Sequence, residues 1–193
     1  MCGRYLFDPR TGELSDYYQE LVTIAKEQNK KIAVDEVFPS NQVVTLIADD
    51  TQQIVPMLTH WGFTGFKKGQ LLINARAETV EEKRTFKKPF LEKRCAFPMS
   101  GFYEWDSDKH KFLFDSSEPL YLAGFYRNHS TASGSEDESI ILTTKPNATI
   151  APIHDRMPVL LSKADVLPWI TDVTFARNYL LQTMPDIHPQ PVS

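Results

Sequence analysis

The sequence predicts an α+β fold: a single domain with a curved, mainly antiparallel, barrel-like β-sheet and helices packed outside it. Three observations predict this fold class. Apolar stretches of strand length follow one another closely between residues 95 and 144, helical periodicity is limited to a few segments, and 13 prolines are scattered along the chain. Prolines in such positions are typical of many loops and short strands. A length of 193 residues suits one domain, so we expect residues 1–193 to form a single unit.

The first half of the chain predicts one helix and a β-hairpin. Residues 2–7 are partly apolar and indicate a strand or an ordered arm. Between residues 14 and 30 the apolar side chains recur on one face of a helix. Residues 43–47 predict a strand, Asp49 and Asp50 a turn, and residues 54–58 the strand that returns beside the first.

The second half predicts most of the sheet. Residues 71–74 indicate a short strand that ends at a polar residue, and the charged segment 76–94 indicates a mixture of loop and helix. The polar segment 130–138 predicts a surface loop. Ser162, with Asp165 three residues later, predicts the first turn of a short helix. The other expected elements are a helix at 175–181 and strands at 95–99, 101–105, 111–115, 120–126 and 139–144.

Composition excludes several classes of protein. With 41% hydrophobic and 24% charged residues, the chain is typical of a soluble globular protein. No apolar run approaches the roughly 20 residues needed to span a bilayer, and charged residues interrupt the N-terminal stretch, unlike a secretory signal. We therefore expect an intracellular, cytoplasmic protein. Two cysteines, Cys2 and Cys95, are too few for a disulfide scaffold. No Cys/His spacing resembles a zinc site, so we expect neither metal nor cofactor, and Cys95 to be a buried core thiol.

The charge distribution is uneven. The net charge is -4, which argues weakly against a nucleic-acid partner. The segment 67–94, however, contains nine basic and four acidic residues. Such a local basic stripe can bind phosphates on an otherwise acidic protein. A solvated helix face is the alternative explanation of the same charges, and charge alone does not decide between the two.

Cys2 is chemically unusual because it follows the initiator Met1 directly. A residue as small as cysteine at this position usually permits removal of the methionine, which leaves a thiol and a free α-amine on adjacent carbons. The amine titrates near about 7.7–8.0 and the thiol near about 8.5, so both have a reactive fraction at neutral pH. An aldehyde forms an imine with the amine, and the thiolate then closes a five-membered thiazolidine. A cysteine without any function is the alternative.

Three polar residues lie in settings that suit acid–base chemistry. Asn74 follows a run of three aliphatic residues, and Glu104 is flanked by aromatic residues, a setting that tends to raise the pKa of a carboxyl. His154 stands beside Asp155 and Arg156, where an imidazole can shuttle protons. Each has a structural alternative: Glu104 as an outward-facing strand residue, and His154 as a hydrogen-bonded loop residue.

Four motifs occur together along the chain. They are MCGRY at residues 1–5, INARAET at 73–79, GFYEW at 101–105 and IHDRMP at 153–158. In this order and spacing, and together with the Trp-Gly pair at 61–62, the chain resembles the SRAP family, the SOS-response-associated peptidase-like or abasic-site-processing proteins. The resemblance extends from residue 1 to about residue 160, and one motif is tied to the N-terminus itself.

The resemblance implies a mechanism. Members of this family bind single-stranded DNA at abasic sites, in DNA repair and the SOS response, and form a covalent cross-link through the N-terminal cysteine. Cys2 is then expected to form a thiazolidine after autocatalytic removal of Met1, with possible abasic-site lyase activity through the same imine. Asn74 would position the amine or the sugar, Glu104 would shuttle protons, and His154 would help to open the sugar to its aldehyde. We expect a cytoplasmic monomer that associates with the nucleoid when bound to DNA, without membrane or metal.

The resemblance also implies a set of DNA contacts. Four arginines match basic family positions and are expected to contact phosphates, which fix register without reading sequence. Trp61, with the nearby aromatic Phe63, is expected to stack on a base or wedge a strand apart. Thr143 matches a family DNA-contact position. The expected DNA-binding residues are Arg4, Trp61, Arg76, Arg84, Thr143 and Arg156.

The chain departs from the family pattern in two places. Family members usually continue past a Pro-Val-Ser-like element, whereas residues 191–193 are the last here, so we expect a domain that is short at the C-terminus. Residues 37–39 also replace a more usual Asn-containing segment.

Two other functions remain open from the residues alone. One is an N-terminal-nucleophile cysteine peptidase or amidohydrolase, with Cys2 as nucleophile, His154 as base and Asn74 as oxyanion donor. The other is a single-strand DNA-binding module without catalytic activity. Turnover of a foreign peptide would support the first, and equal affinity for intact and abasic strands without a covalent product would support the second.

Overall fold

A closed five-stranded barrel forms the centre of the molecule. The computed structural model describes residues 2–10, 12–117, 119–131 and 134–192. Each strand of the barrel is hydrogen-bonded to the next, and the pairing of β11 with β12 closes it. All pairs are antiparallel except β12 with β4, so the predicted curved, mainly antiparallel sheet is confirmed. In spatial order the strands are β12 (Gly134–Thr144), β4 (Ile54–Trp61), β3 (Gln42–Ala48), β8 (Arg94–Met99) and β11 (Leu120–Thr131).

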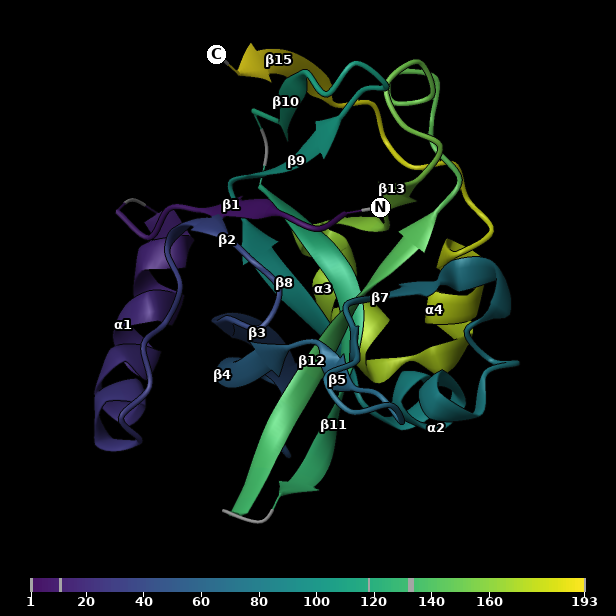
Figure 1. Cartoon of the computed structure of the whole chain (residues 1–193). Coiled ribbons are helices and arrows are strands. Elements are labelled where there is room, and N and C mark those ends of the chain that lie inside the picture. The colour runs from purple at the N-terminus through teal and green to yellow at the C-terminus, as the bar shows by residue number, and fades with distance from the viewer. Residues whose placement is uncertain (1, 11, 118, 132–133, 193) are drawn as a thin grey trace.

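Shorter strands extend the barrel, and a second sheet lies above it in Figure 1. β7 (Asn74–Arg76) and β13 (Met157–Pro158) pair with β12, and β14 (Leu160–Ser162) pairs with β11. β5 (Phe63–Thr64) and β6 (Leu71–Leu72) form a small hairpin. The second sheet has the order β15 (His188–Val192), β10 (Lys111–Asp115), β9 (Gly101–Trp105), β1 (Tyr5–Phe7) and β2 (Asp35–Val37).

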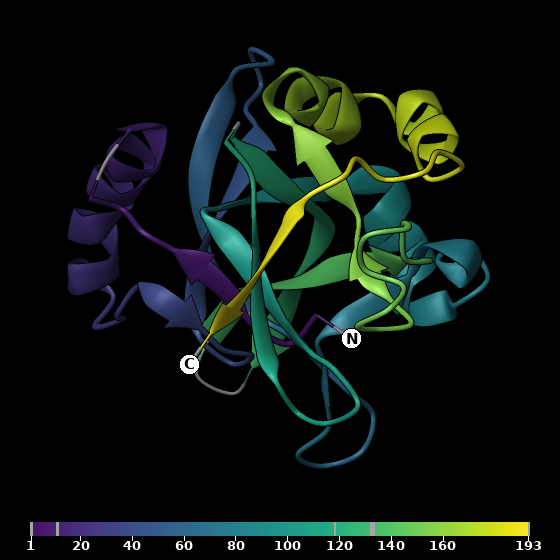
Figure 2. The same ribbon diagram turned by 90° about the horizontal axis from the view of Figure 1, so that it is seen from above.

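Helices surround this sheet system, as the view from above shows (Figure 2). α1 lies on one flank, and α2, α3 and α4 lie on the others. Ser162 and Asp165 form the predicted capping box at the start of α3, with a 2.6 Å bond between their side chains. In the described part of the chain, no helix has the length and apolarity needed to cross a membrane. The helices are α1 (Gly12–Glu27), the 3-10 helix η1 (Ala77–Thr79), α2 (Arg84–Glu92), α3 (Lys163–Thr171) and α4 (Val173–Tyr179).

The predicted hairpin at residues 43–58 is confirmed. β3 and β4 pair from Gln42 opposite His60 to Ala48 opposite Ile54. Asp49 holds the turn because its carboxylate accepts the amide protons of residues 51 and 53. An Asx-type turn of this kind fixes the register, and the register places the apolar face of β3 in the core.

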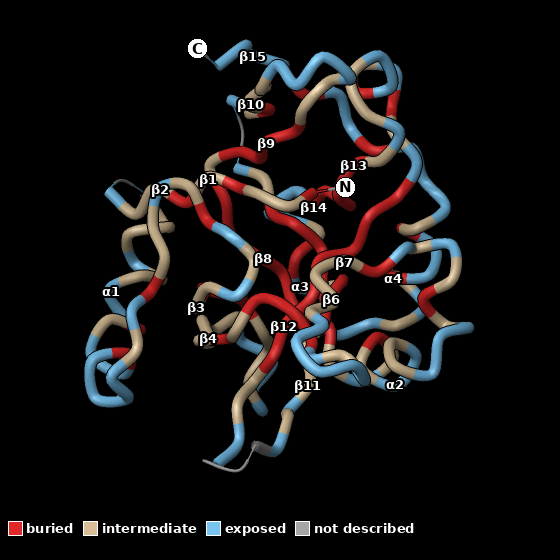
Figure 3. Tube along the Cα trace, in the orientation of Figure 1, coloured by how far each residue is buried: buried red, intermediate tan, exposed pale blue. Residues whose placement is uncertain are grey.

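The core fills the barrel and the space beneath α3, where the tube in Figure 3 is red. The indole of Trp169 donates to the carbonyl of Cys95 at 3.0 Å, and Cys95 is fully buried, as predicted. The guanidinium of Arg94 is also buried, although the sequence places it in the basic segment 67–94. It donates to backbone carbonyls at the C-terminal ends of α2 and α3, namely Phe90, Leu91, Trp169 and Ile170.

The prediction of a polar surface loop at residues 130–138 is wrong. Residues 130–131 belong to β11 and residues 134–138 to β12, which pair as a long hairpin that projects below the barrel in Figure 1, while residues 132–133 lie outside the described residues. Glu138 explains the error, because its carboxylate is buried and bonded by Arg127 and Thr64. Arg127 and Glu138 lie opposite each other in the ladder. Arg127 and Glu138 therefore satisfy each other across the hairpin, although polar residues nearer its tip are exposed.

Candidate active site

Cys2 lies where the two large sheets meet. It lies three residues before β1, whose Tyr5 pairs with Phe102 of β9 in the second sheet. Asn74 begins β7, which runs parallel to β12 of the barrel. The Asn74 Nδ2 atom donates to the backbone carbonyl of Cys2 at 2.8 Å and so joins the two sheets at this point. The other side-chain atom of Asn74, Oδ1, is buried and has no hydrogen-bond partner among the described residues.

The thiol of Cys2 is fully buried and protonated in this form of the protein. Its Sγ atom lies 3.8 Å from the carbonyl oxygen of Arg4. Burial raises the pKa of the Cys2 thiol far above its usual value, and the nearby carboxylate of Glu104 raises it further. With Met1 attached, the nitrogen of Cys2 belongs to a peptide bond. In this form Cys2 therefore has no α-amine, and its thiol is buried with a raised pKa.

Glu104 projects inward from β9, so the alternative of an outward-facing strand residue is excluded. Only 3% of its side chain is exposed. Burial raises the pKa of the Glu104 carboxyl, and the opposing effect of His154 does not cancel the rise. A carboxyl with a raised pKa exchanges protons closer to neutral pH, which is the property that general acid–base catalysis requires.

His154 lies in the loop between β12 and β13 and faces Glu104. Its Nε2 atom is 3.8 Å from Glu104 Oε2, too far for a direct hydrogen bond but close enough for an ionic interaction. Its Nδ1 atom accepts the backbone N–H of Arg156 at 3.0 Å. The carbonyl of Arg156 and the carboxylate of Asp155 also lie near Nδ1, at 3.1 and 3.2 Å, and favour a proton there. Nδ1 thus has one possible donor and two possible acceptors beside it, and these contacts hold the ring in place.

The four predicted catalytic residues therefore converge. Asn74 contacts Cys2, Glu104 acts electrostatically on Cys2, and His154 faces Glu104. They come from the N-terminal arm, β7, β9 and the β12–β13 loop, and only the closed sheet system brings these segments together.

The predicted arginines fall into two groups. Arg76 and Arg84 are exposed, and no ion pair joins either of them to another residue in the described ranges. Arg4 instead pairs with Glu36 at 2.8 Å. Arg156 is largely buried and forms a two-point ion pair with Glu78.

Trp61 and Thr143, which were predicted as DNA contacts, lie in the interior of this structure. Both are fully buried. The indole of Trp61 packs 5.4 Å from the ring of Tyr5 and donates to the carbonyl of Ile73 at 3.1 Å. The hydroxyl of Thr143 faces the carbonyl of Ala75 at 3.5 Å. In this structure neither side chain is exposed to a base or a phosphate. The aromatic ring of Trp61 is stabilised more by the core than by water.

A stack of alternating cations and aromatic rings lies beside β1, and the sequence predicted only one of its members, Arg4. The guanidinium carbon of Arg4 lies 4.1 Å from the ring centre of Phe38 and 5.2 Å from that of Trp105. The ammonium of Lys111 lies 4.1 Å from the ring centre of Tyr103. The only sequence signal was the aromatic run at residues 102–105. Lys111 joins it through the β9–β10 register, which places it opposite Trp105.

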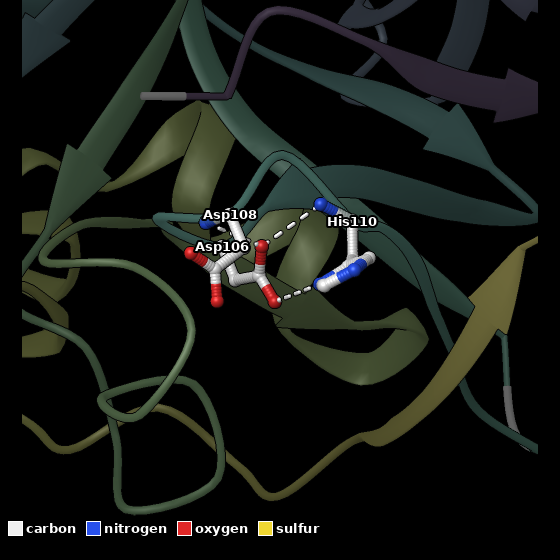
Figure 4. Close-up of side chains that lie close together, drawn as sticks. All are labelled: Asp106, Asp108 and His110. Atoms are coloured by element: carbon white, nitrogen blue, oxygen red, sulfur yellow. Dashed lines mark hydrogen bonds and ion pairs between the residues drawn. The ribbon is translucent and has the colours of Figure 1, made fainter.

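The turn between β9 and β10 brings together three possible metal ligands, Asp106, Asp108 and His110 (Figure 4). Their ligand atoms lie within 4.8 Å of one another. The carboxylate of Asp106 accepts the backbone amides of Asp108 and His110 and the imidazole of His110. These bonds shape the tight turn, in which Lys109 has a positive φ of 67°. These hydrogen bonds explain the conformation of the turn, and we assign no metal ion to it.

Comparison with known proteins identifies the family. A family model described as SOS response associated peptidase (SRAP) matches residues 1–193. The abasic site processing protein YoqW of Bacillus subtilis is 36% identical over 192 residues, which cover 93% of this chain and 84% of that protein. The abasic site processing protein YedK of Escherichia coli is 27% identical over 184 residues, 88% of this chain and 79% of that one. A crystal structure of a protein from Bordetella bronchiseptica shares the fold, with a TM-score of 0.80 at 19% identity over both whole chains. The chain thus belongs to the SOS response associated peptidase (SRAP) family.

Proposed function

We propose that this chain processes abasic sites in single-stranded DNA and links itself covalently to them through Cys2. The observation that carries the proposal is the hydrogen bond from Asn74 to the carbonyl of Cys2, with the Glu104–His154 pair beside it. Relatives named as abasic site processing proteins support the same conclusion. Residues 1–193 would act as one monomeric domain that associates with the nucleoid when bound to DNA.

Removal of Met1 is the first step. Hydrolysis breaks the bond between the carbonyl carbon of Met1 and the nitrogen of Cys2, and water supplies the hydroxyl to the methionine and a proton to the new amine. Glu104 is suited to accept a proton from the attacking water, because its raised pKa makes it a stronger base than an ordinary carboxylate. The product has an α-amine next to the Cys2 thiol, held in place through the carbonyl that Asn74 binds.

The cross-link then forms in three steps. His154 donates a proton to the ring oxygen of the abasic sugar as the anomeric hydroxyl loses its own, which opens the ring to the aldehyde. The amine of Cys2 adds to the aldehyde, and loss of one water gives the imine. The thiol adds its sulfur to the imine carbon and its proton to the nitrogen, which closes the thiazolidine. Glu104 shuttles the protons of imine formation and of its reversal.

Two further aspects follow from the same chemistry. The imine also acidifies the adjacent carbon of the sugar, so elimination of the 3′ phosphate, a lyase reaction, competes with closure by the thiol.

Strand binding would depend on the exposed residues Arg76 and Arg84, whose side chains are available for phosphates. A peptidase acting on foreign peptides is less well supported. The side-chain amide of Asn74 donates its hydrogen bond to the carbonyl of the protein's own Cys2, whereas an oxyanion donor would donate to the substrate.

Borohydride trapping tests this function. Wild-type protein mixed with a labelled single strand containing one abasic site is expected to give a heat-stable band on a denaturing gel without reductant. A Cys2→Ala variant without Met1 retains an α-amine but no thiol, so it is expected to give the band only when borohydride reduces the imine. Turnover of an unrelated peptide without any DNA band would favour the peptidase. Equal affinity for intact and abasic strands without a band would favour a simple binding module.

A further inference from the structure

Two cations share one carboxylate oxygen beside β1 of the second sheet. Arg4 Nη1 and Lys111 Nζ each donate to Oε1 of Glu36 at 2.8 Å. Arg4 precedes β1, Lys111 begins β10 and Glu36 lies in β2, so three separate segments build the cluster. Since both bonds end on the same oxygen, the two cations lie close enough together for a single anion to bridge them.

Aromatic rings hold the two cations in place. The guanidinium of Arg4 lies over the rings of Phe38 and Trp105. The ammonium of Lys111 lies 4.1 Å from the ring centre of Tyr103 and 5.7 Å from that of Trp105, so Trp105 contacts both cations. These cation–aromatic contacts restrict both side chains, and the pair is therefore already arranged to bind an anion.

Glu36 is the anion that the cations bind in this structure, and its carboxyl is ionised. Burial alone would raise the pKa of Glu36, but the hydrogen bonds from Lys111 and Arg4 outweigh this effect and lower the pKa. The exposed fraction of the side chain is 29% for Glu36, 34% for Arg4 and 23% for Lys111. Ion pairs as accessible as these contribute little to stability, so an anion from outside can replace the carboxylate.

The cluster lies next to Cys2 along the N-terminal arm. Arg4 is two residues from Cys2, and its backbone carbonyl lies 3.8 Å from the Cys2 Sγ atom. A strand that places its abasic sugar at Cys2 continues from there in both directions, and its phosphates are neutralised by cations along the path. Arg4 and Lys111 provide two such cations next to the arm that carries Cys2.

We propose that Arg4 and Lys111 together bind a phosphate of the single strand beside the abasic nucleotide, and that Glu36 occupies this phosphate site until the strand replaces it. The inference rests on the proposed function, because it concerns the same DNA strand. It makes Lys111 a strand-binding residue. It makes Glu36 a competitor within the protein, whose carboxylate lowers the affinity for single-stranded DNA.

Titration of a fluorescent, undamaged single-stranded oligonucleotide at four salt concentrations tests the phosphate site without any covalent step. Lys111→Gln is expected to lower the slope of log affinity against log salt by about 0.7, the value of one phosphate contact. Lys111→Arg is expected to keep the wild-type slope, because a guanidinium retains the charge. Glu36→Gln is expected to raise the affinity about threefold or more, because no carboxylate then competes with the phosphate. Misfolding cannot produce such a gain.

Lys109 provides a matched control two residues from Lys111. It is exposed in the turn between β9 and β10, and its side chain has no ion pair or aromatic partner among the described residues. Lys109→Gln removes the same charge and is expected to change the slope much less than Lys111→Gln. A double variant completes the comparison. In the Lys111→Gln background the gain from Glu36→Gln is expected to shrink, because Glu36 then competes for Arg4 alone.

Two results would overturn the proposal. One is a Lys111→Gln slope equal to that of Lys109→Gln, and the other is a Glu36→Gln affinity at or below that of wild type. In either case the cluster would only hold β2 and β10 against the N-terminal arm. A wild type that binds the undamaged strand but forms no adduct with the abasic strand would instead refute the proposed function, and the affinities of the variants would still decide whether the phosphate site exists.

Discussion

The side-chain amide of Asn74 donates a 2.8 Å hydrogen bond to the backbone carbonyl of Cys2. The bond connects the barrel, through β7, to the N-terminal arm that leads into β1. It fixes Cys2 by its backbone carbonyl and involves neither the nitrogen nor the sulfur of that residue.

Loss of this bond is expected to slow cross-linking. Asn74→Ala removes one hydrogen bond with a net value of about 1 kcal/mol, so the rate constant of adduct formation should fall roughly fivefold. Gel quantification over time at saturating abasic strand measures the change. Asn128→Ala serves as a control, because Asn128 contacts only Asp137 on the distant hairpin in the described structure. A rate constant for Asn74→Ala equal to that of this control would contradict a positioning role for Asn74.

Glu104→Gln is expected to stabilise the protein and to abolish its cross-linking to abasic DNA. Burial raises the pKa of Glu104 in the folded state above its ordinary value of 4.5, so the folded state binds the proton more tightly and loses stability as pH rises through the raised pKa. A neutral glutamine removes this loss. We expect a Tm about 2–4 °C above wild type at pH 7, equivalent to about 1 kcal/mol in a domain of this size, and no difference below pH 4.5.

Glu81→Gln provides the opposite case for the same measurement. The bond to Arg177 lowers the pKa of Glu81, so the pair stabilises the protein at pH values above the ordinary carboxyl pKa and this contribution is lost as pH falls through the lowered pKa. Thermal unfolding from pH 3 to 8 should therefore show the two variants shifting in opposite directions at neutral pH. Shifts of the same sign would contradict the assigned environments.

Arg76→Gln and Arg84→Gln are expected to weaken strand binding uniformly across sequences. Each exposed arginine that neutralises a phosphate releases a counterion, so each substitution should lower the slope of log affinity against log salt by about 0.7 for a single strand. Titration of a fluorescent strand at four salt concentrations measures the slope. Arg10→Gln is the control, because Arg10 already pairs with Asp8. An unchanged slope in both variants would exclude these two residues from the DNA interface.

Arg94 is expected to act on stability alone. Arg94→Met leaves four backbone carbonyls at the ends of α2 and α3 without their donor, at a cost of about 3 kcal/mol or more. Lys93→Met should change the free energy of unfolding by less than about 1 kcal/mol, since the Lys93 side chain makes only a cation–π contact, with Tyr126, among the described residues. Urea unfolding of both variants measures the difference, and equal values would show that the buried guanidinium contributes nothing specific.

Local patterns in the sequence predicted much of the fold. The hairpin of β3 and β4 and the cap of α3 follow from turn and capping residues next to apolar runs, so short-range chemistry determines them. The segment 130–138 could not be predicted in this way. Its polar composition indicates a loop unless Glu138 is known to meet Arg127 and Thr64, and Thr64 is distant in the sequence.

The candidate site was likewise predicted only in part. Cys2, Asn74, Glu104 and His154 were predicted from motifs, and the structure places them together. The burial of Trp61 was not predicted, because a large aromatic ring is equally suited to stacking on a base and to filling a core. Neither burial nor the pairing of strands distant in sequence can be read from a single sequence.

Intact mass spectrometry of protein mixed with a single strand containing one abasic site tests the role of Cys2 most directly. Wild type, Cys2→Ala and an undamaged strand would be compared, and the mass of the free protein would show whether Met1 has been removed. We predict a species with the mass of protein without Met1 plus DNA minus one water molecule, formed only by wild type and only with the abasic strand. Protein that has lost Met1 and yet forms no such species would contradict the assignment of Cys2 as the cross-linking residue.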